Sequence, residues 1–289
     1  MTELSLPAAR RVSWLPSLRH IGANVLELRR RNVLMAVTVA FTVGVPVIFF
    51  GIREITHLVN PAHYGAAGGT GALKFVTLMA EFGFILAVVL GASAGTDDLN
   101  DGMFRQFVVT GRSKVALYLA RIPAGLSILL GLAAVGYIVT ALATAFLSTP
   151  LAPGEAIPSA GQMAAALTEC GLWFELYLVV GFTVGLGLAV LMGQRTVPVV
   201  LLIVWEIILT PALADLVIPR FVNVHRLIIG VAMDQLQPAV LGGGVLVGQT
   251  GGTTFAVPPM PTWAMGAVIA GWIICWLAIG AWKMTTRDA

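Results

Sequence analysis

The 289-residue chain is 58% hydrophobic and only 11% charged, with a formal net charge of +3. This balance excludes an ordinary soluble domain. The apolar residues fall in runs of about 20, the length that a helix needs to cross the hydrocarbon layer, and the alternating polarity of barrel strands is absent. The composition therefore predicts an all-α, polytopic membrane protein with a single transmembrane domain over residues 1–289.

The N-terminal segment is basic and has an apolar helical face. Leu18, Ile21, Val25 and Leu28 recur at three- and four-residue spacing among six arginines. This pattern predicts an interfacial helix over residues 12–31 whose arginines reach anionic lipid headgroups. A disordered basic tail is the alternative.

Six apolar runs follow the basic segment. We expect membrane spans at residues 33–52, 72–92, 115–147, 171–192, 197–217 and 263–282. The connection at 193–196 is so short that the spans on either side of it must be antiparallel neighbours. The interval 218–262 is the longest outer loop; its first half is amphipathic and is expected to re-enter the interface, and its second half, 242–252, is expected to be a flexible loop.

The basic residues predict the orientation. With six spans, 13 of the 17 Lys and Arg residues fall on one side, together with both termini. Positively charged loops stay in the cytoplasm, so we expect a multi-pass protein of the cell membrane with both termini cytoplasmic.

The polar segment 97–111, between the second and third spans, has the pattern of a short amphipathic helix. Asp101 can cap this helix, Gly111 can end it, and Met103, Phe104, Phe107 and Val108 share one face. A helix of this kind between two spans is expected to dock on a partner. The alternative is a helix that rests on lipid, which three nearby aspartates disfavour at an anionic surface.

The chain lacks the motifs of nucleotide binding and hydrolysis. It contains no GxxxxGK[ST], no HExxH and no GxSxG. We therefore expect no catalytic residue, no metal site and no cofactor in this chain, and energy for transport from a partner or from an ion.

The same central segment resembles the coupling loop of ABC-2 type exporter permeases. Asp98 and Gly102 match that family's acidic residue and glycine, and 104–109 match its apolar helix. Thr110-Gly111 stands where Thr-Pro is usual, Ser113-Lys114 where Ser-Arg is usual, and Arg121 where a lysine is usual.

The resemblance implies a membrane subunit, not an enzyme, that moves a hydrophobic or amphipathic small molecule, drug, lipid or peptide out of the cell. Its implied partners are a nucleotide-binding ATPase subunit, which would hold ATP and Mg²⁺, a second permease copy or a paralogue, and membrane lipids; no nucleic acid is implied. The residues expected to couple to the ATPase are Asp98, Asp101, Gly102, Met103, Phe104, Arg105, Phe107 and Val108.

Three glutamates fall inside the predicted spans: Glu81, Glu175 and Glu206. A carboxylate that faces lipid costs a few kcal/mol or more, so each must face protein or water, or be protonated. They predict either a conduit for cationic, amphipathic cargo or hydrogen bonds between spans, and the structural explanation is favoured for Glu175.

Two other functional classes fit the composition. One is an ion-coupled carrier that uses Glu81 or Glu206 as its proton site. The other is a membrane immunity or sensor protein that binds a toxin or drug without moving it.

Overall fold

The computed structural model describes residues 16–61, 63–65, 67–68, 70–100, 113–147, 159–210, 224, 226–242, 246–250, 253–257 and 260–286. In this part of the chain the fold is predominantly helical. Five helical segments are long and apolar enough to cross a membrane, as in a transmembrane protein.

The N-terminal helices are α1 (Leu18–Arg29) and a continuous rod made of α2 (Asn32–Val39), the π turn η1 (Ala40–Gly44) and α3 (Val45–Val59). Helix α1 packs against α6, and its Leu28 is buried. The rod is longer than the span predicted at 33–52: residues 53–59, expected in a polar connection, continue the helix.

The middle of the chain forms three long helices. After the short turn η2 (Thr70–Lys74) come α4 (Phe75–Asn100), α6 (Lys114–Phe146) and α7 (Ala160–Met192). Helix α7 begins earlier than the span predicted from 171, because Ser159 and Gln162 form a capping box at Ala160. It ends at Gly193, whose φ of 71° is the left-handed conformation that glycine adopts without strain.

The C-terminal part begins with α8 (Thr196–Val204), which continues through the π turn η3 (Trp205–Leu209) to Thr210. Residues 211–217 of the predicted fifth span lie outside the described residues, so this segment is not among the five candidate spans. Then come α11 (Ile229–Leu236), the turn η5 (Ala239–Leu241), strands β1 (Leu246–Thr250) and β2 (Thr253–Val257), and α12 (Thr262–Thr286).

The expectation of a flexible loop at 242–252 was wrong, because residues 246–250 form a strand. Strands β1 and β2 pair as an antiparallel hairpin, with Leu246 opposite Val257 and Thr250 opposite Thr253. The residues Thr253, Thr254, Phe255 and Val257 are strand formers, and two residues of sequence Gly-Gly separate the strands, which is a hairpin pattern.

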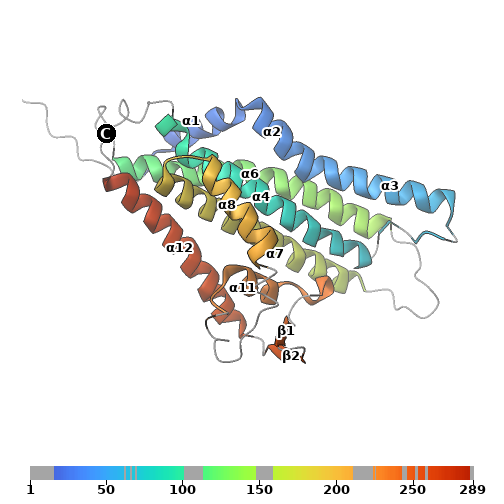
Figure 1. Ribbon diagram of the computed structural model, residues 1–289. Helices are drawn as coiled ribbons and strands as arrows, with labels where there is room; N and C mark the ends of the chain where they lie inside the picture. Colours follow the sequence, from blue (N-terminus) through green and yellow to red (C-terminus); the bar gives the residue numbers. More distant parts are fainter. Residues whose placement is uncertain are drawn as a thin grey trace, which may run out of the picture.

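Helices α4 and α7 form the core, and the other long helices surround them (Figure 1). The apolar stretches of α7 and α4 are 78% and 67% buried, whereas those of the Asn32–Val59 rod, α6 and α12 are 22%, 28% and 17% buried. The outer helices therefore present most of their apolar surface to the surroundings, as helices in a lipid bilayer do.

Small residues bring the two core helices together. A Cβ added to Gly185 of α7 would lie 2.6 Å from the Val88 carbonyl oxygen of α4, and one added to Gly95 of α4 would lie 3.0 Å from the Leu186 carbonyl oxygen of α7. Only glycine allows backbones to approach this closely.

A second close contact attaches the N-terminal rod to α6. Pro46 has no N–H to donate to the Thr42 carbonyl oxygen as an α-helix would require, and the π turn η1 lies at this position. Gly136 of α6 lies directly against that oxygen, because a Cβ added there would collide with it. The proline and the glycine together set the distance between these two helices.

Candidate functional site

The predicted coupling segment lies almost entirely outside the described residues. Of its expected contact residues, Asp98 is in the last turn of α4, and Asp101, Gly102, Met103, Phe104, Arg105, Phe107 and Val108 fall in the undescribed stretch 101–112. Helix α4 continues to Asn100, so residues 97–100, expected in the coupling helix, belong to α4. Helix α6 then begins after Ser113, whose Oγ accepts a hydrogen bond of 3.4 Å from the Ala116 N–H.

Two of the three intramembrane glutamates come together, and the third does not. Glu81 of α4 lies within electrostatic range of Glu206 in η3. Glu175 of α7 is half-buried and one of its carboxylate oxygens, Oε2, has no hydrogen-bond partner. It is two residues from Tyr177, which faces Glu206, and residues two apart on a helix point to different sides.

The Glu206 carboxyl is buried, with 6% of the residue exposed, and two hydroxyl groups bind it. Tyr177 of α7 donates its phenolic O–H to Oε1, and Thr210 donates to Oε2 at 3.4 Å. The Tyr177 ring is itself held between Phe84, at 5.5 Å between centroids, and Trp173, at 5.4 Å. The buried carboxyl therefore has hydroxyl partners from two segments.

The backbone at Glu206 is a π turn for a local reason. The Thr210 N–H bonds to the Trp205 carbonyl oxygen, five residues back. The next residue in the sequence, Pro211, has no N–H for the Ile207 carbonyl oxygen, so one α-helical hydrogen bond is lost at this point. Single π turns inside helices are frequent at functional sites.

Helix α11 supplies a third carboxyl, Asp234, which the sequence analysis did not select. The Trp173 indole N–H donates to the Met233 carbonyl oxygen at 3.0 Å, and the Gln237 amide donates to the Thr77 hydroxyl of α4 at 3.1 Å. These bonds fix α11 between α4 and α7. Burial, and then the nearby Glu206 carboxyl, raise the pKa of Asp234 to about 6.

The charged groups that act on one another at this place are all acidic among the described residues: Glu81, Glu206 and Asp234, around the Tyr177 hydroxyl. We call these four residues the acidic cluster. In the described part of the chain no group of three or more His, Cys, Asp or Glu side chains is placed to hold a metal ion. The arrangement suits a proton or an organic cation better than a coordinated metal.

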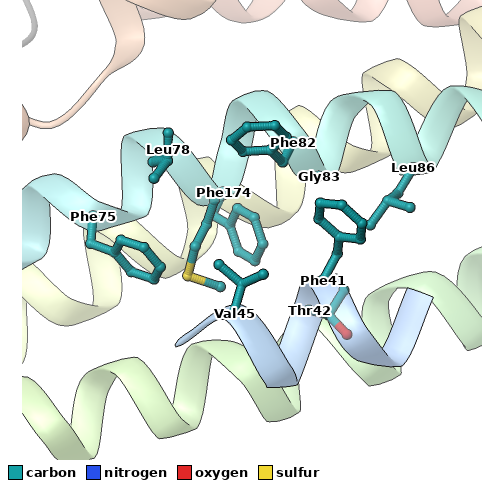
Figure 2. Close-up of a pocket in the computed structure, with 10 residues that line it drawn as sticks. Phe41, Thr42, Val45, Phe75, Leu78, Phe82, Gly83, Leu86 and Phe174 are labelled. Atoms are coloured by element: carbon teal, nitrogen blue, oxygen red, sulfur yellow. The ribbon is translucent and has the colours of Figure 1, made fainter. Parts of the chain in front are cut away.

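Figure 2 shows an apolar pocket between the N-terminal rod and α4. Its walls are aromatic and aliphatic, and the two sides meet at Phe41 and Phe82, 6.0 Å apart between ring centroids. The lining residues are Phe41, Thr42, Val45, Phe75, Leu78, Met79, Phe82, Gly83, Leu86 and Phe174. The cavity volume of about 20 Å³ holds about one water-sized sphere, so this pocket is not a preformed chamber for a drug-sized molecule.

Arg121 lies elsewhere than expected. The sequence analysis matched it to the family's lysine, and its place at the mouth of a span predicts a side chain that reaches lipid phosphates. Only 3% of it is exposed, and its Nη1 donates to the Gly95 carbonyl oxygen of α4 at 2.8 Å. Arg121 therefore ties α6 to α4 near the ends that border the predicted coupling segment.

Sequence reasoning missed Tyr177, Thr210 and Asp234. Tyrosine and threonine are unremarkable in an apolar run, so their roles depend on which helix lies opposite. Asp234 did carry a signal, since it is the only charged residue of the apolar stretch Ile229–Leu236.

Comparison with known proteins adds no further constraint: no family model matches the chain, and no curated protein matches it.

Proposed function

We propose that the chain is the membrane subunit of an ABC-2 type exporter, driven by a separate ATPase subunit that holds ATP and Mg²⁺. Its cargo is a hydrophobic or amphipathic small molecule, drug, lipid or peptide, moved out of the cell. A working transporter contains a second permease, either a copy of this chain or a paralogue.

The proposal is supported best by the position of the end of α4 and the start of α6, which border the predicted coupling segment. In Figure 1 the end of α4, the start of α6, the turn from α7 to α8 and the end of α12 gather at the left of the view, near α1. The basic residues Arg29, Arg30, Lys114, Arg195 and Lys283 belong to these same ends. This grouping supports a cytoplasmic face with six crossings, both termini on it, and the segment 97–111 available to a cytosolic partner.

The proposed coupling between the ATPase and the membrane helices depends on the short helix predicted at 97–111. A short helix joined to two spans converts the movement of a docked ATPase into displacement of α4 and α6. In the predicted helix, Phe104 and Phe107 fill a pocket of the partner, and Asp98, Asp101 and Arg105 form its charged rim. The buried Arg121–Gly95 hydrogen bond supports the transmission, because it makes α4 and α6 move together at this end.

The acidic cluster supports a cargo path for cationic, amphipathic molecules. Glu81 of α4 is exposed, and the buried Glu206 lies within electrostatic range of it. We propose that these two glutamates face the path and that Glu175, which lies apart from them, does not.

Co-purification tests the proposal. The variant Phe107→Asp in the full chain is expected to lose the nucleotide-binding subunit that purifies with the wild-type chain from its native membrane, because a carboxylate replaces an aromatic side chain in a desolvated contact. The matched control is Gln106→Asp, which adds the same charge on the opposite face of the predicted helix and should retain the partner. Equal retention in both variants would contradict the proposal.

The acidic cluster also favours one second function, an ion-coupled carrier. Three carboxyls in range of one another, Glu81, Glu206 and Asp234, are suited to exchange protons. Transport by the purified chain alone in liposomes, driven by a pH gradient without ATP, would favour the carrier over the exporter.

A further inference from the structure

The segment from α8 to Thr210 is held to the core on one side only. Leu202 is buried, whereas Val200, Val204 and Ile208 are 55%, 42% and 57% exposed. Its regular helix ends at the π turn, where the backbone pattern before Pro211 changes. This segment therefore depends on a few specific contacts for its position.

The polar contact between this segment and α7 is the hydrogen bond from Tyr177 to Glu206. Thr210 adds a second, longer bond to the same carboxyl within the segment, and its methyl group packs against Gly230 of α11, where a Cβ would collide with it. Glu206 thus sits at the point where α7, the π turn and α11 meet.

We propose that Tyr177 is a positioning residue that latches the π turn to α7 by holding the Glu206 carboxyl inside the fold. When α8 and η3 move away from α7, this bond must break, and the Glu206 carboxyl loses its buried donor. The charged groups that then face it, from the described elements packed around it, are Glu81 of α4 and Asp234 of α11. Glu206 therefore becomes exposed only when the α8–η3 segment moves away from α7, and the segment cannot move without exposing it.

This inference concerns the chain alone and is independent of the proposed ATPase partner. The test uses the full-length chain in lipid nanodiscs, without nucleotide or a second subunit. A failed co-purification experiment would leave the latch intact, and a failed latch experiment would leave the exporter proposal intact.

The variant Tyr177→Phe keeps the ring between Phe84 and Trp173 and removes only the O–H group. Hydrogen exchange of the amides in Trp205–Thr210 should become at least about tenfold faster, the effect of losing a hydrogen bond to a carboxyl group. The infrared bands of the Glu206 carboxyl, identified as those absent from Glu206→Gln, should shift in frequency, because they report the lost donor directly.

The matched control is Tyr137→Phe. Its hydroxyl also donates in the interior, to the Leu167 carbonyl oxygen of α7, and its ring stacks on Phe174. This control should leave both the exchange of 205–210 and the Glu206 bands unchanged. Unchanged exchange and bands in Tyr177→Phe, or equal changes in Tyr137→Phe, would overturn the latch.

A second variant keeps the test decisive if Tyr177→Phe does not fold. Thr210→Val preserves the shape of the side chain and removes the 3.4 Å bond to Glu206 Oε2. A shift of the Glu206 bands, with a smaller rise in exchange than the tenfold expected for Tyr177→Phe, supports the latch. Unaltered bands and exchange would show that the Thr210 hydroxyl takes no part in holding the carboxyl, and would overturn the hydrogen-bonded site from which the latch is inferred.

Discussion

Individual polar side chains in the apolar helices bind to oxygens nearby. Thr38, Thr42 and Thr96 each donate to the carbonyl oxygen four residues earlier, at 2.8, 2.8 and 2.9 Å. Arg121 reaches across to α4 for the same purpose. In a medium without water such bonds remove the penalty of an unsatisfied hydroxyl or guanidinium group, so these residues are structural.

Asp234 differs from them because its ionisation responds to the fold. Its pKa rises from 3.8 to about 6 in the folded chain, so between these values the folded state binds more protons than the unfolded state. The corresponding stability is fully present below pH 3.8 and is lost as the pH rises through about 6. Asp234→Asn cannot ionise and should remove this part of the pH dependence.

Thermal unfolding in detergent across this pH range measures the effect. The wild-type midpoint should fall as the pH rises toward neutrality, and the midpoint of Asp234→Asn should fall less. Glu169→Gln, which replaces an exposed carboxyl on α7, should retain the wild-type profile. The interpretation of Asp234 fails if its variant and the wild type lose stability in parallel.

At the same scale, the sequence indicated some members of the acidic cluster and not others. Glu81 and Glu206 stood out because a carboxylate in a long apolar run needs an explanation from its surroundings. Nothing along the chain indicates that Tyr177 lies opposite Glu206, because that contact depends on how α7 packs against the π turn. The positions of charges could be predicted, and their partners could not.

Among the elements, the close contact between α4 and α7, which we call the seam, decides the architecture. Gly83, Ala87, Gly91 and Gly95 recur every four residues on α4, and Gly181 and Gly185 do so on α7. The GxxxG formed by Gly181 and Gly185 favours close helix packing, but a spacing that 32 glycines make common does not indicate which helix fills that face.

Gly185→Ala should destabilise the seam. The added methyl group would lie 2.6 Å from the Val88 carbonyl oxygen and 2.9 Å from its Cα, and backbone atoms cannot move aside without separating the helices. We expect a loss of about 1–3 kcal/mol, typical of an overpacked core, seen as a lower unfolding midpoint.

The control for the seam is Gly271→Ala on α12, where nothing lies within 4 Å of the added methyl group. This variant should unfold at the wild-type temperature or above it, because alanine favours a helix over glycine. If both variants behave alike, close backbone approach is not what joins α4 to α7.

Element boundaries were less predictable than element types. Hydropathy marks where a helix is apolar, whereas backbone hydrogen bonding decides where it ends, so α3 continues through residues 53–59 and α7 starts at its capping box. The hairpin was missed because glycines beside β1 were interpreted as a flexible loop, although the residues of β2 favour a strand.

For the whole molecule, the number of crossings remains a prediction. The segment from Thr196 is described only as far as Thr210, and the sixth crossing depends on whether it continues through 211–217. Six crossings require both termini on one side, whereas five place them on opposite sides.

Reporter fusions test this count. A fluorescent protein that folds only in the cytoplasm, fused in turn to the N-terminus and to the C-terminus, should be bright in both fusions. The same reporter inserted in the interval 148–158 should be dark, because that interval joins the far ends of α6 and α7 and serves as the control. A dark C-terminal fusion with a bright N-terminal one would show that 197–217 does not cross.

The contact of Pro46, Thr42 and Gly136 has a consequence for access from the bilayer. The backbones of the N-terminal rod and α6 approach closely at Thr42 and Gly136, and the rod meets α4 through ring contacts such as Phe49 on Phe75, 4.0 Å apart between centroids. Under the proposed export function, a hydrophobic solute in the acyl chains would enter beside Phe82, as the N-terminal rod moves away from α4. The glycine-lined seam between α4 and α7 would not open during this movement.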